Sequence, residues 1–501
     1  MLLIYPPLVK PSEPPVGLAR IAGAFVAHGG TCRVLDANLE GLQYLLGRSC
    51  SRDDTWSKRA GGRVNDNLIS MRSSHAYENR SRYQRCVADL NRVLQVVTES
   101  RGLRLTLSDY RDERLSPLSS VDLLDSAENY ESNPFFAYFD ERLGLIVPEA
   151  EPAVIGISLN YLSQALSAFA MAGFIRHRWP AIKIVMGGGL ITSWMRRPGW
   201  HNPFAGLLDE LVAGPGEAKL LQMSGIVQEE RSAVPDYTGF ALDRYLAPGR
   251  ILPYSASRGC YWNRCSFCPE RAEKNRYTPV HHKTVIDDIH TISDYYDPAL
   301  IHFTDNAMSP ALLHALIDNP PGSDWYGFAR VTTQLADIDY CRALKAAGCR
   351  MIKLGLESGD REVLERLSKG VIPDLSSNVL RSLKAAGVAV YAYLLFGTPA
   401  EDRQAACKTL EFTASHADCI DFLNLAIFNM PLFCDDSADV EVSSFYEGDL
   451  SLYTDFKHPA GWGRREIRQF LDRQFVRHPA VAPIIRNDPP VFTSNHAPFF
   501  V

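Results

Sequence analysis

The stretch Cys260-Tyr261-Trp262-Asn263-Arg264-Cys265-Ser266-Phe267-Cys268 places three cysteines within nine positions. Three thiolates on one short loop can bind three irons of a [4Fe–4S] cube and leave the fourth iron open to another ligand. A structural zinc site normally has a fourth Cys or His nearby, and the nearest candidates are His281 and His282. Pro279 and the basic residues before these histidines are unlike a zinc knuckle. We therefore expect Cys260, Cys265 and Cys268 to hold an iron–sulfur cluster, with zinc as the alternative.

The residues after this loop alternate between strand and helix patterns. Apolar runs predict strands at 301–304, 326–330, 351–356 and 388–396. Helical spacing occupies 338–347, 361–367 and 375–386 between them. Such a series predicts a partial or full TIM-type (β/α) barrel over residues 254–433.

Three motifs follow the cysteine loop in order along the barrel. They are Phe303-Thr304-Asp305-Asn306, Lys353-Leu354-Gly355-Leu356-Glu357-Ser358-Gly359, and Leu395-Phe396-Gly397-Thr398-Pro399 with Glu401. As an ordered set, the loop and the motifs resemble the radical S-adenosylmethionine (SAM) superfamily over about residues 250–430. One departure is that four residues, rather than three, separate the first two cysteines.

The resemblance implies a cofactor arrangement for this site. The open iron would chelate the amino and carboxylate groups of SAM, and the predicted SAM contacts are Phe267, Asp305, Glu357, Ser358 and Gly397. The reduced cluster would pass one electron to the sulfonium and produce a 5′-deoxyadenosyl radical. The protein must keep that radical dry and hold the target atom in place.

The N-terminal residues predict a second α/β sheet. Strand patterns at 2–5, 33–36, 153–159, 182–186 and 211–213 alternate with helical patterns such as 16–28 and 163–177. This alternation is typical of a Rossmann-like parallel sheet. We assign residues 1–233 to this domain, with a mainly helical insertion at about 47–149, and residues 234–253 to a linker.

No GxGxxG dinucleotide fingerprint follows the first strand. Instead, the loops after the strands resemble the cobalamin-binding domain that precedes many radical SAM barrels. The residues carried over as cobalamin contacts are Pro7, Asn38, Ser158, Leu159, Asn160, Gly187, Gly188, Gly189, Gly214 and Glu217. The Asp-x-His-x-x-Gly motif is absent from residues 1–220, which predicts cobalt without a histidine lower ligand. The alternative is a degenerate α/β domain that has lost its cofactor.

Together the two resemblances imply a class B radical SAM methyltransferase-like enzyme. It would move a methyl group from SAM, via methylcobalamin, to an unactivated carbon of a protein or peptide side chain or of a natural-product intermediate. One alternative is a cobalamin-dependent radical SAM enzyme that performs a cyclisation or rearrangement. A cobalamin-binding iron–sulfur sensor is a third possibility. A methylthiotransferase is a weaker fourth, because Cys32, Cys50 and Cys86 are too widely spaced for its extra cluster.

The overall composition of the chain indicates which partners and which cellular compartment to expect. The chain has 501 residues, a formal net charge of -6 and no long basic block, so nucleic acid is not expected as the main partner. No apolar stretch reaches the length of a membrane span. The 11 cysteines are otherwise scattered, which suits a reducing compartment, and we expect a cytoplasmic protein. A flavodoxin or ferredoxin would supply electrons, and a small α-rich segment at 434–501 could close the site.

Overall fold

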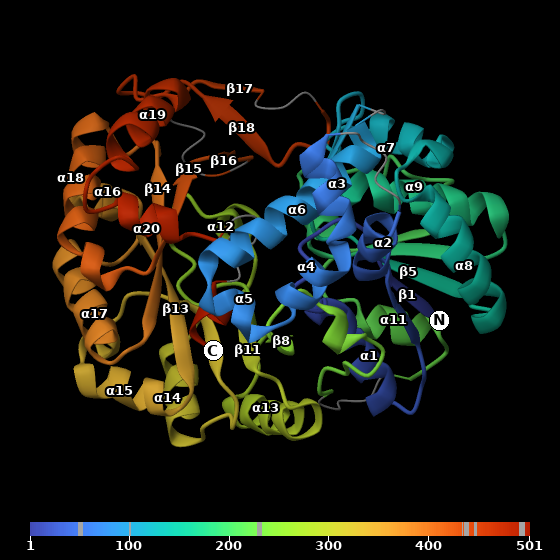
Figure 1. Ribbon diagram of the computed structural model, residues 1–501, viewed down its shortest axis with the longest axis horizontal. Coiled ribbons are helices and arrows are strands. Elements are labelled where there is room, and N and C mark those ends of the chain that lie inside the picture. The colour runs from blue at the N-terminus through green and yellow to red at the C-terminus, as the bar shows by residue number, and fades with distance from the viewer. Residues whose placement is uncertain are drawn as a thin grey trace. The chain divides into compact units, whose positions relative to one another are not determined.

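The computed structural model describes residues 1–48, 54–99, 102–227, 233–432, 434, 440–444, 448–489 and 496–501. The chain divides into two compact units. Unit 1 comprises Met1–Leu252, Glu447–Ser451 and Pro490–Phe492, and unit 2 comprises Pro253–Tyr446, Leu452–Pro489 and Thr493–Val501. Each unit is built on one mainly parallel sheet, as the alternating sequence pattern predicts (Figure 1).

Unit 1 contains a parallel sheet of five strands in the order β2-β1-β5-β6-β7. The strands are β1 (Leu2–Tyr5), β2 (Arg33–Asp36), β5 (Val154–Ser158), β6 (Lys183–Gly187) and β7 (Glu210–Val212). The helices that follow them are α1 (Val16–Ala27), α2 (Ala37–Leu46), α9 (Leu162–Arg178), α10 (Gly189–Met195) and α11 (Glu217–Met223). The strand order reverses at β1 and β5, and ligands of open α/β sheets bind beyond the carboxyl ends of strands at such a point.

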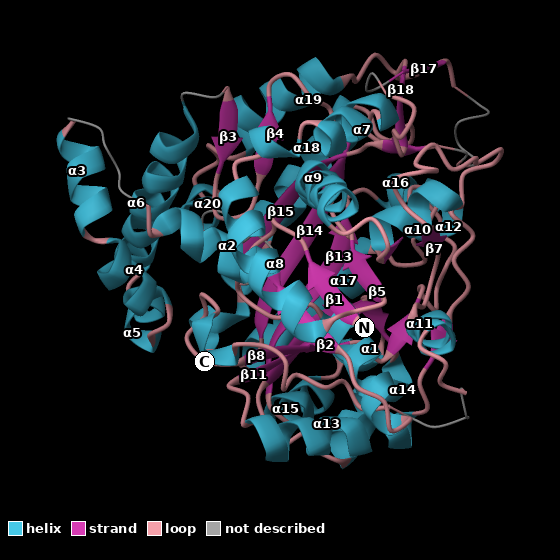
Figure 2. Cartoon of the chain, turned by 90° about the vertical axis from the view of Figure 1, so that its right-hand side faces the viewer, coloured by secondary structure: helices cyan, strands magenta, loops and turns pink. Residues whose placement is uncertain are grey.

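The predicted insertion is mainly helical in the described residues. It contains α3 (Thr55–Gly62), α4 (Val64–Met71), α5 (Ser74–Glu78), α6 (Arg80–Thr98), α7 (Ser120–Glu128) and α8 (Phe136–Ala150). The first three of these pack along α6 (Figure 2). An antiparallel hairpin of β3 (Leu103–Leu105) and β4 (Tyr110–Asp112) was not predicted. α7 approaches α9 closely because position 173 is glycine, where a Cβ atom would lie 1.9 Å from the Ala127 carbonyl oxygen.

A short segment from late in the chain completes unit 1. The Ser120 amide donates to Asp449 Oδ1 at 2.8 Å, and the Leu450 amide donates to the Leu118 carbonyl at 2.8 Å. The first amides of a helix have no partner within the helix. Asp449 therefore caps the N-terminus of α7.

Unit 2 contains a sheet of six strands in the order β15-β14-β13-β12-β11-β8. They are β8 (Ile251–Tyr254), β11 (Leu300–Met308), β12 (Trp325–Ala329), β13 (Cys349–Glu357), β14 (Ala389–Phe396) and β15 (Phe422–Ile427), and β11 to β15 pair in parallel. The helices between them are α13 (His282–Tyr296), α14 (Pro310–Asp318), α15 (Ile338–Ala346), α16 (Arg361–Arg366), α17 (Pro373–Ala385) and α18 (Arg403–Ser415). In Figure 1, helices α14 to α18 lie along the outer side of this sheet. No pairing joins β15 to β8 among the described residues, so the sheet takes the partial form of the predicted barrel.

Several short elements complete unit 2. It comprises β9 (Ser257–Arg258), α12 (Pro269–Ala272), β10 (Thr278–Pro279), β16 (Met430–Pro431), β17 (Val442–Ser444), β18 (Tyr453–Phe456), α19 (Arg464–Phe470) and α20 (Ala482–Asn487). The small antiparallel sheet β16-β18-β17 was not predicted in a segment expected to be α-rich.

Candidate functional site

The three-cysteine loop lies between β9 and α12. Gly259 precedes it with φ +71°, and a Cβ atom there would lie 2.8 Å from the Arg276 carbonyl oxygen. The three cysteines are free, with Cys265 buried and Cys260 and Cys268 half-buried. Burial raises the pKa of the Cys265 thiol and raises that of Cys268 to about 11. Iron binding at this loop would therefore release protons, because a metal takes the thiolate form.

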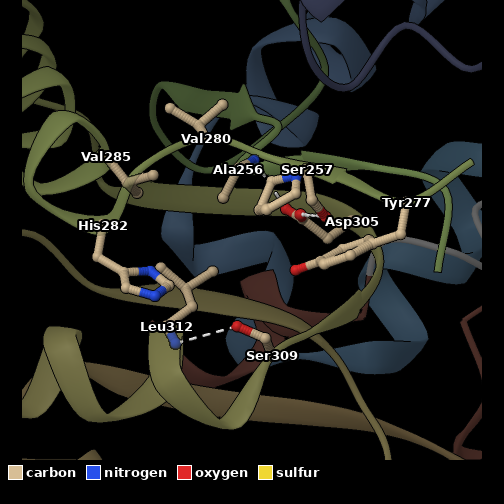
Figure 3. A pocket seen from close by; sticks show the side chains of 10 residues that line it. Ala256, Ser257, Tyr277, Val280, His282, Val285, Asp305, Ser309 and Leu312 are labelled. Atoms are coloured by element: carbon tan, nitrogen blue, oxygen red, sulfur yellow. Dashed lines mark hydrogen bonds between the residues drawn. The ribbon is translucent and has the colours of Figure 1, made fainter. Parts of the chain in front are cut away.

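The three cysteines supply the type of donor that a [4Fe–4S] cube binds. Within the described ranges, no three His, Cys, Asp or Glu side chains gather as ligands of a single ion. His282, a zinc alternative, lines a small cavity with Ser257 and Asp305 (Figure 3). The loop thus offers three thiols that a [4Fe–4S] cube could use, one iron each.

Two buried cations lie beside the loop, and sequence reasoning missed both. Arg330, directly after β12, is 6% exposed and directs Nη1 to Cys265 Sγ at 3.8 Å. Lys369 is 4% exposed, and its Nζ lies 5.7 Å from the centre of the Phe267 ring. For Arg330 the sequence signal was a basic residue at the carboxyl end of a buried strand, whereas Lys369 lies after α16 and has no such signal. Positive charge at this place would offset the negative charge of a thiolate-bound cluster.

The end of β13 reaches one of these cations, Lys369. Glu357 has φ +63° and accepts a hydrogen bond from Lys369 Nζ at 2.6 Å. Lys369 therefore links three predicted site residues: it pairs with Glu357, lies over Phe267, and lowers the pKa of Cys265 by its charge. Sequence positions 265, 267 and 357 are thus brought together in space.

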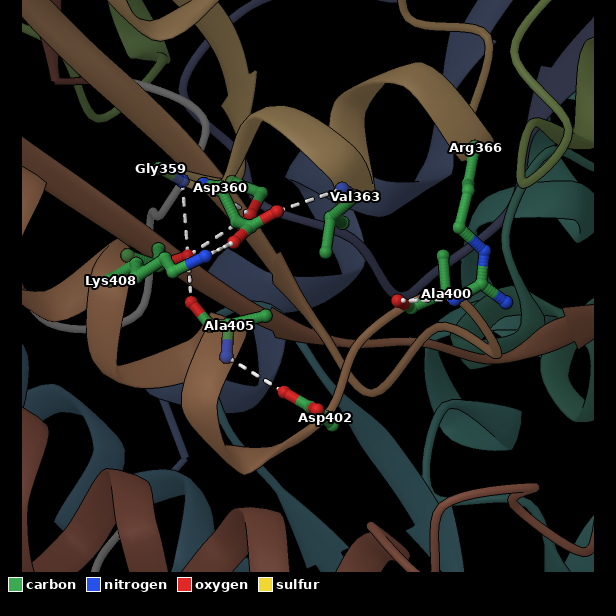
Figure 4. A network of polar contacts seen from close by, with 10 residues as sticks. Gly359, Asp360, Val363, Arg366, Ala400, Asp402, Ala405 and Lys408 are labelled. Atoms are coloured by element: carbon green, nitrogen blue, oxygen red, sulfur yellow. Dashed lines mark hydrogen bonds and ion pairs between the residues drawn. The ribbon is translucent and has the colours of Figure 1, made fainter.

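Ser358 is held by a different network, which involves the middle of α18. Its hydroxyl lies 3.1 Å from Thr409 Oγ1, which also accepts the Gly359 amide at 3.0 Å. Asp360 pairs with Lys408 at 2.6 Å in the same network (Figure 4). The Ser358 side chain therefore has a structural partner, and its predicted contact with SAM stays a prediction.

Gly397, at the end of β14, has φ +80°, and a Cβ atom there would lie 2.2 Å from Ile467 Cδ1. Its amide donates to Glu401 Oε2 at 2.5 Å, and the Trp462 indole donates to the same oxygen at 3.1 Å. Burial raises the pKa of Glu401 to about 7. The carboxyl group thus ties the strand end to the C-terminal segment.

Aromatic residues of the C-terminal segment, expected to close the site, pack into the core of unit 2. The Phe475 ring lies 5.3 Å from that of Phe396 at the end of β14, and the Trp462 and Phe470 rings are 5.7 Å apart. The Phe492–Asn495 part of the expected closure lies outside the described residues.

Asp305 lies on β11, apart from the contacts around Lys369. Its carboxylate accepts hydrogen bonds from the Ser257 hydroxyl and, at 3.0 Å, from the Ala256 amide (Figure 3). Burial raises the pKa of this carboxyl. Asp305 therefore anchors the segment that leads into the cysteine loop, and no contact places it with Glu357 or Gly397.

In unit 1, the loops after β5 and β6 come together. Asn160 Oδ1 accepts the Gly189 amide at 2.9 Å, and Leu159 donates to the Gly187 carbonyl at 2.7 Å. Gly188 has φ +110°, and a Cβ atom there would lie 2.4 Å from the Leu159 carbonyl oxygen. Gly188 therefore lets these two loops form a close backbone cradle at 158–160 and 187–189, and the contact of this cradle with cobalamin stays a prediction.

Other predicted cobalamin contacts have structural partners in unit 1. Asn38 is 2% exposed, and its Oδ1 accepts the Val9 amide at 2.8 Å. Glu217 pairs with Arg20 at 3.0 Å. Gly214 has φ +74° with open space at its Cβ position, and its amide donates to Thr192 Oγ1 at 2.9 Å.

Sequence reasoning also missed Gln164, which orders the loop after β5. Its Oε1 accepts the amides of Asn160 and Tyr161 at 3.1 Å, and its Nε2 donates to the Pro6 carbonyl at 2.7 Å. The loop that contains Pro7 is thereby joined to residues 160–161. The sequence signal was a glutamine in the first turn of an otherwise apolar helix, and the structure shows that this side chain is fully buried.

The sequence was compared with protein families and with known proteins. No protein-family model matches the sequence. A methyltransferase of Pyrococcus horikoshii described as uncharacterized is 24% identical over 307 residues, which is 53% of this chain and 65% of that protein. The match thus spans slightly less than two-thirds of that relative's length. None of the described helices is both long and apolar enough to cross a bilayer.

Among solved structures, the chain resembles the radical SAM methyltransferase TsrM from Kitasatospora setae, with cobalamin and a [4Fe–4S] cluster bound. The TM-score is 0.50 at 17% identity, over 86% of this chain and 72% of that one. The cobalamin-dependent SAM radical enzyme OxsB aligns over 53% of this chain and 44% of its own, at 19% identity and a TM-score of 0.41. In its fold, this chain is therefore similar to the radical SAM methyltransferase TsrM, in line with the resemblance indicated by the motifs.

Proposed function

We propose that this protein is a cobalamin-dependent radical SAM methyltransferase that transfers a methyl group from SAM to an unactivated carbon. The observation that carries the proposal is the free three-cysteine loop, with Cys265 buried beside Arg330 and Lys369. The acceptor would be a protein or peptide side chain or a natural-product intermediate. A flavodoxin or ferredoxin would provide the electron.

We assign the following roles to residues of this chain. Cys260, Cys265 and Cys268 would hold the cluster, which supplies one-electron reduction of the sulfonium when bound. Glu357, already paired with a buried ammonium group, suits recognition of a second ammonium, the SAM amino group.

Two further groups of residues would hold SAM and cobalamin. Phe267, with Gly397, would face the adenine, while Asp305 and Ser358 would support the loop and strand end around SAM. In unit 1, the backbone cradle at 158–160 and 187–189 would receive cobalamin, with Pro7, Asn38, Gly214 and Glu217 around it.

The experiment is anaerobic reconstitution with iron, sulfide and cobalamin, followed by reduction in the presence of SAM carrying a deuterated methyl group. We expect a cluster EPR signal, a cobalamin absorption spectrum, 5′-deoxyadenosine, and deuterated methyl groups in peptides or small molecules of a lysate. The C265A variant should lose the cluster and all products, whereas C407A, a half-buried cysteine on α18, should retain them.

The outcomes separate the competing functions. 5′-Deoxyadenosine without a methylated product would assign the non-methylating radical reaction instead. Bound cobalamin and cluster without cleavage of SAM would assign a sensor. Zinc in place of iron, or full turnover by C265A, would refute the proposal.

A further inference from the structure

Arg330 is a buried cation for which the described residues provide no carboxylate partner. Its Nη2 donates to the Lys369 carbonyl and its Nη1 points to Cys265 Sγ at 3.8 Å. A guanidinium 6% exposed is costly to bury unless something compensates its charge. Arg330 also hydrogen-bonds the side chain of Tyr261, a neutral phenol, and the neighbouring thiol, once deprotonated, is an anionic group toward which it points.

The extended cysteine loop holds this guanidinium in place through Trp262. The Arg330 Cζ atom lies 4.3 Å from the centre of the indole ring, and the indole donates to the Ser368 carbonyl at 3.0 Å. Gly370 has φ +72°, and a Cβ atom there would lie 2.1 Å from a ring atom. The backbone at 368–370 is thus shaped to receive Trp262, which stands between the first two cysteines.

We propose that Arg330 is a positioning residue that sets the reduction potential of the cluster, with Trp262 as its platform. This inference rests on the proposed function, because it requires a [4Fe–4S] cluster on the loop. One electron from an external donor converts the cluster from the 2+ to the 1+ state and adds one negative charge. An N–H group and a positive charge directed at a ligand sulfur stabilise the reduced state, which raises the potential.

Arg264 provides a matched control. Its Cζ atom lies 5.0 Å from the centre of the same indole ring, but the side chain is exposed and makes no contact with a cysteine among the described residues. R264Q and R330Q therefore each remove one positive charge that stacks on the Trp262 ring. Only R330Q also removes the donor to Cys265.

The test is an EPR-monitored redox titration of the reconstituted full chain, with iron and sulfide content measured for each variant. In R330Q, the ratio of reduced to oxidised cluster at a fixed potential should fall about tenfold, which for one electron is a midpoint about 59 mV lower. R264Q should match the wild type. W262L should shift in the same direction as R330Q by a smaller factor, because Arg330 loses its platform but not its charge.

The outcomes separate this inference from the proposed function. A wild-type protein that binds no cluster would overturn both. A normal cluster whose midpoint is unchanged in R330Q, or equally shifted in R264Q, would overturn this inference alone. If R330Q fails to take up iron, the W262L variant provides the test. A lowered midpoint potential of its cluster supports the proposal, and an unchanged midpoint potential overturns it.

Discussion

Replacing Glu401 by glutamine should abolish a large part of the pH dependence of unfolding. Glu401 is 2% exposed, and both of its hydrogen bonds, from the amide of Gly397 and the indole of Trp462, reach Oε2. Its Oε1 has no partner among the described residues. Burial therefore favours the neutral acid, and glutamine has the size and charge of that form.

The pKa gives the sign and the size of the effect. The pKa of Glu401 rises from 4.5 to about 7 in the folded state, so the folded protein binds this proton more tightly than the unfolded chain does. The resulting stability is complete below pH 4.5 and is lost as the pH rises through 7. At about 1.4 kcal/mol per pKa unit, the loss amounts to about 3 kcal/mol.

The measurement is urea unfolding of the wild type and E401Q at pH 5 and at pH 8, under reducing conditions. E401Q should gain about 2.5 kcal/mol relative to the wild type between the two pH values, because a small part of the effect is already lost at pH 5. Any cost of an unpaired amide group is present at both pH values and cancels. E411Q, which alters an exposed glutamate on α18, should change nothing. Parallel pH profiles for the wild type and E401Q would refute the reasoning.

Three further predictions test other parts of the molecule. K369M leaves the buried Glu357 carboxylate unpaired, so it should cost about 3–5 kcal/mol in urea unfolding, and K369M/E357Q should recover most of that loss. G188A places a side chain at φ +110° against a backbone carbonyl and should cost at least about 2 kcal/mol and weaken cobalamin retention, whereas G199A, with open space around it, should retain cobalamin. Burial raises the pKa of Asp36 to about 6, so stability falls with rising pH between about 4 and 6, and D36N should flatten the thermal-midpoint profile there.

The sequence predicted the parts of the fold that consist of buried parallel strands. Residues such as those of β13 form a nearly continuous apolar run, because both faces of the strand are covered. The hairpin β3–β4 and the strands β17 and β18 were missed, since they are three or four residues long with few apolar positions. Such short strands depend on their partners rather than on a periodic signal.

The candidate site was predictable only where its residues are adjacent in the chain. The cysteine loop is local, and its motif is complete in nine positions. Arg330 lies 65 positions from Cys265, and nothing local indicates that the two meet. Conversely, Asn38 stands at a strand end as a cofactor contact would, yet its amide oxygen bonds the backbone of Val9, 29 positions earlier.

The hydrogen bond from the Ser120 amide at the start of α7 to Asp449 limits where this chain can be divided into fragments. A ribosome must translate the distant residues 448–451 before the amide of Ser120 and the carbonyl of Leu118 gain their partners. A gene fragment ended at the linker would encode the whole five-stranded sheet and keep the Ser119 cap of α7, but it would lose the Asp449 partner of the Ser120 amide. Split or chimeric versions of this protein should therefore carry this tetrapeptide, for example as a tether fused behind the first fragment.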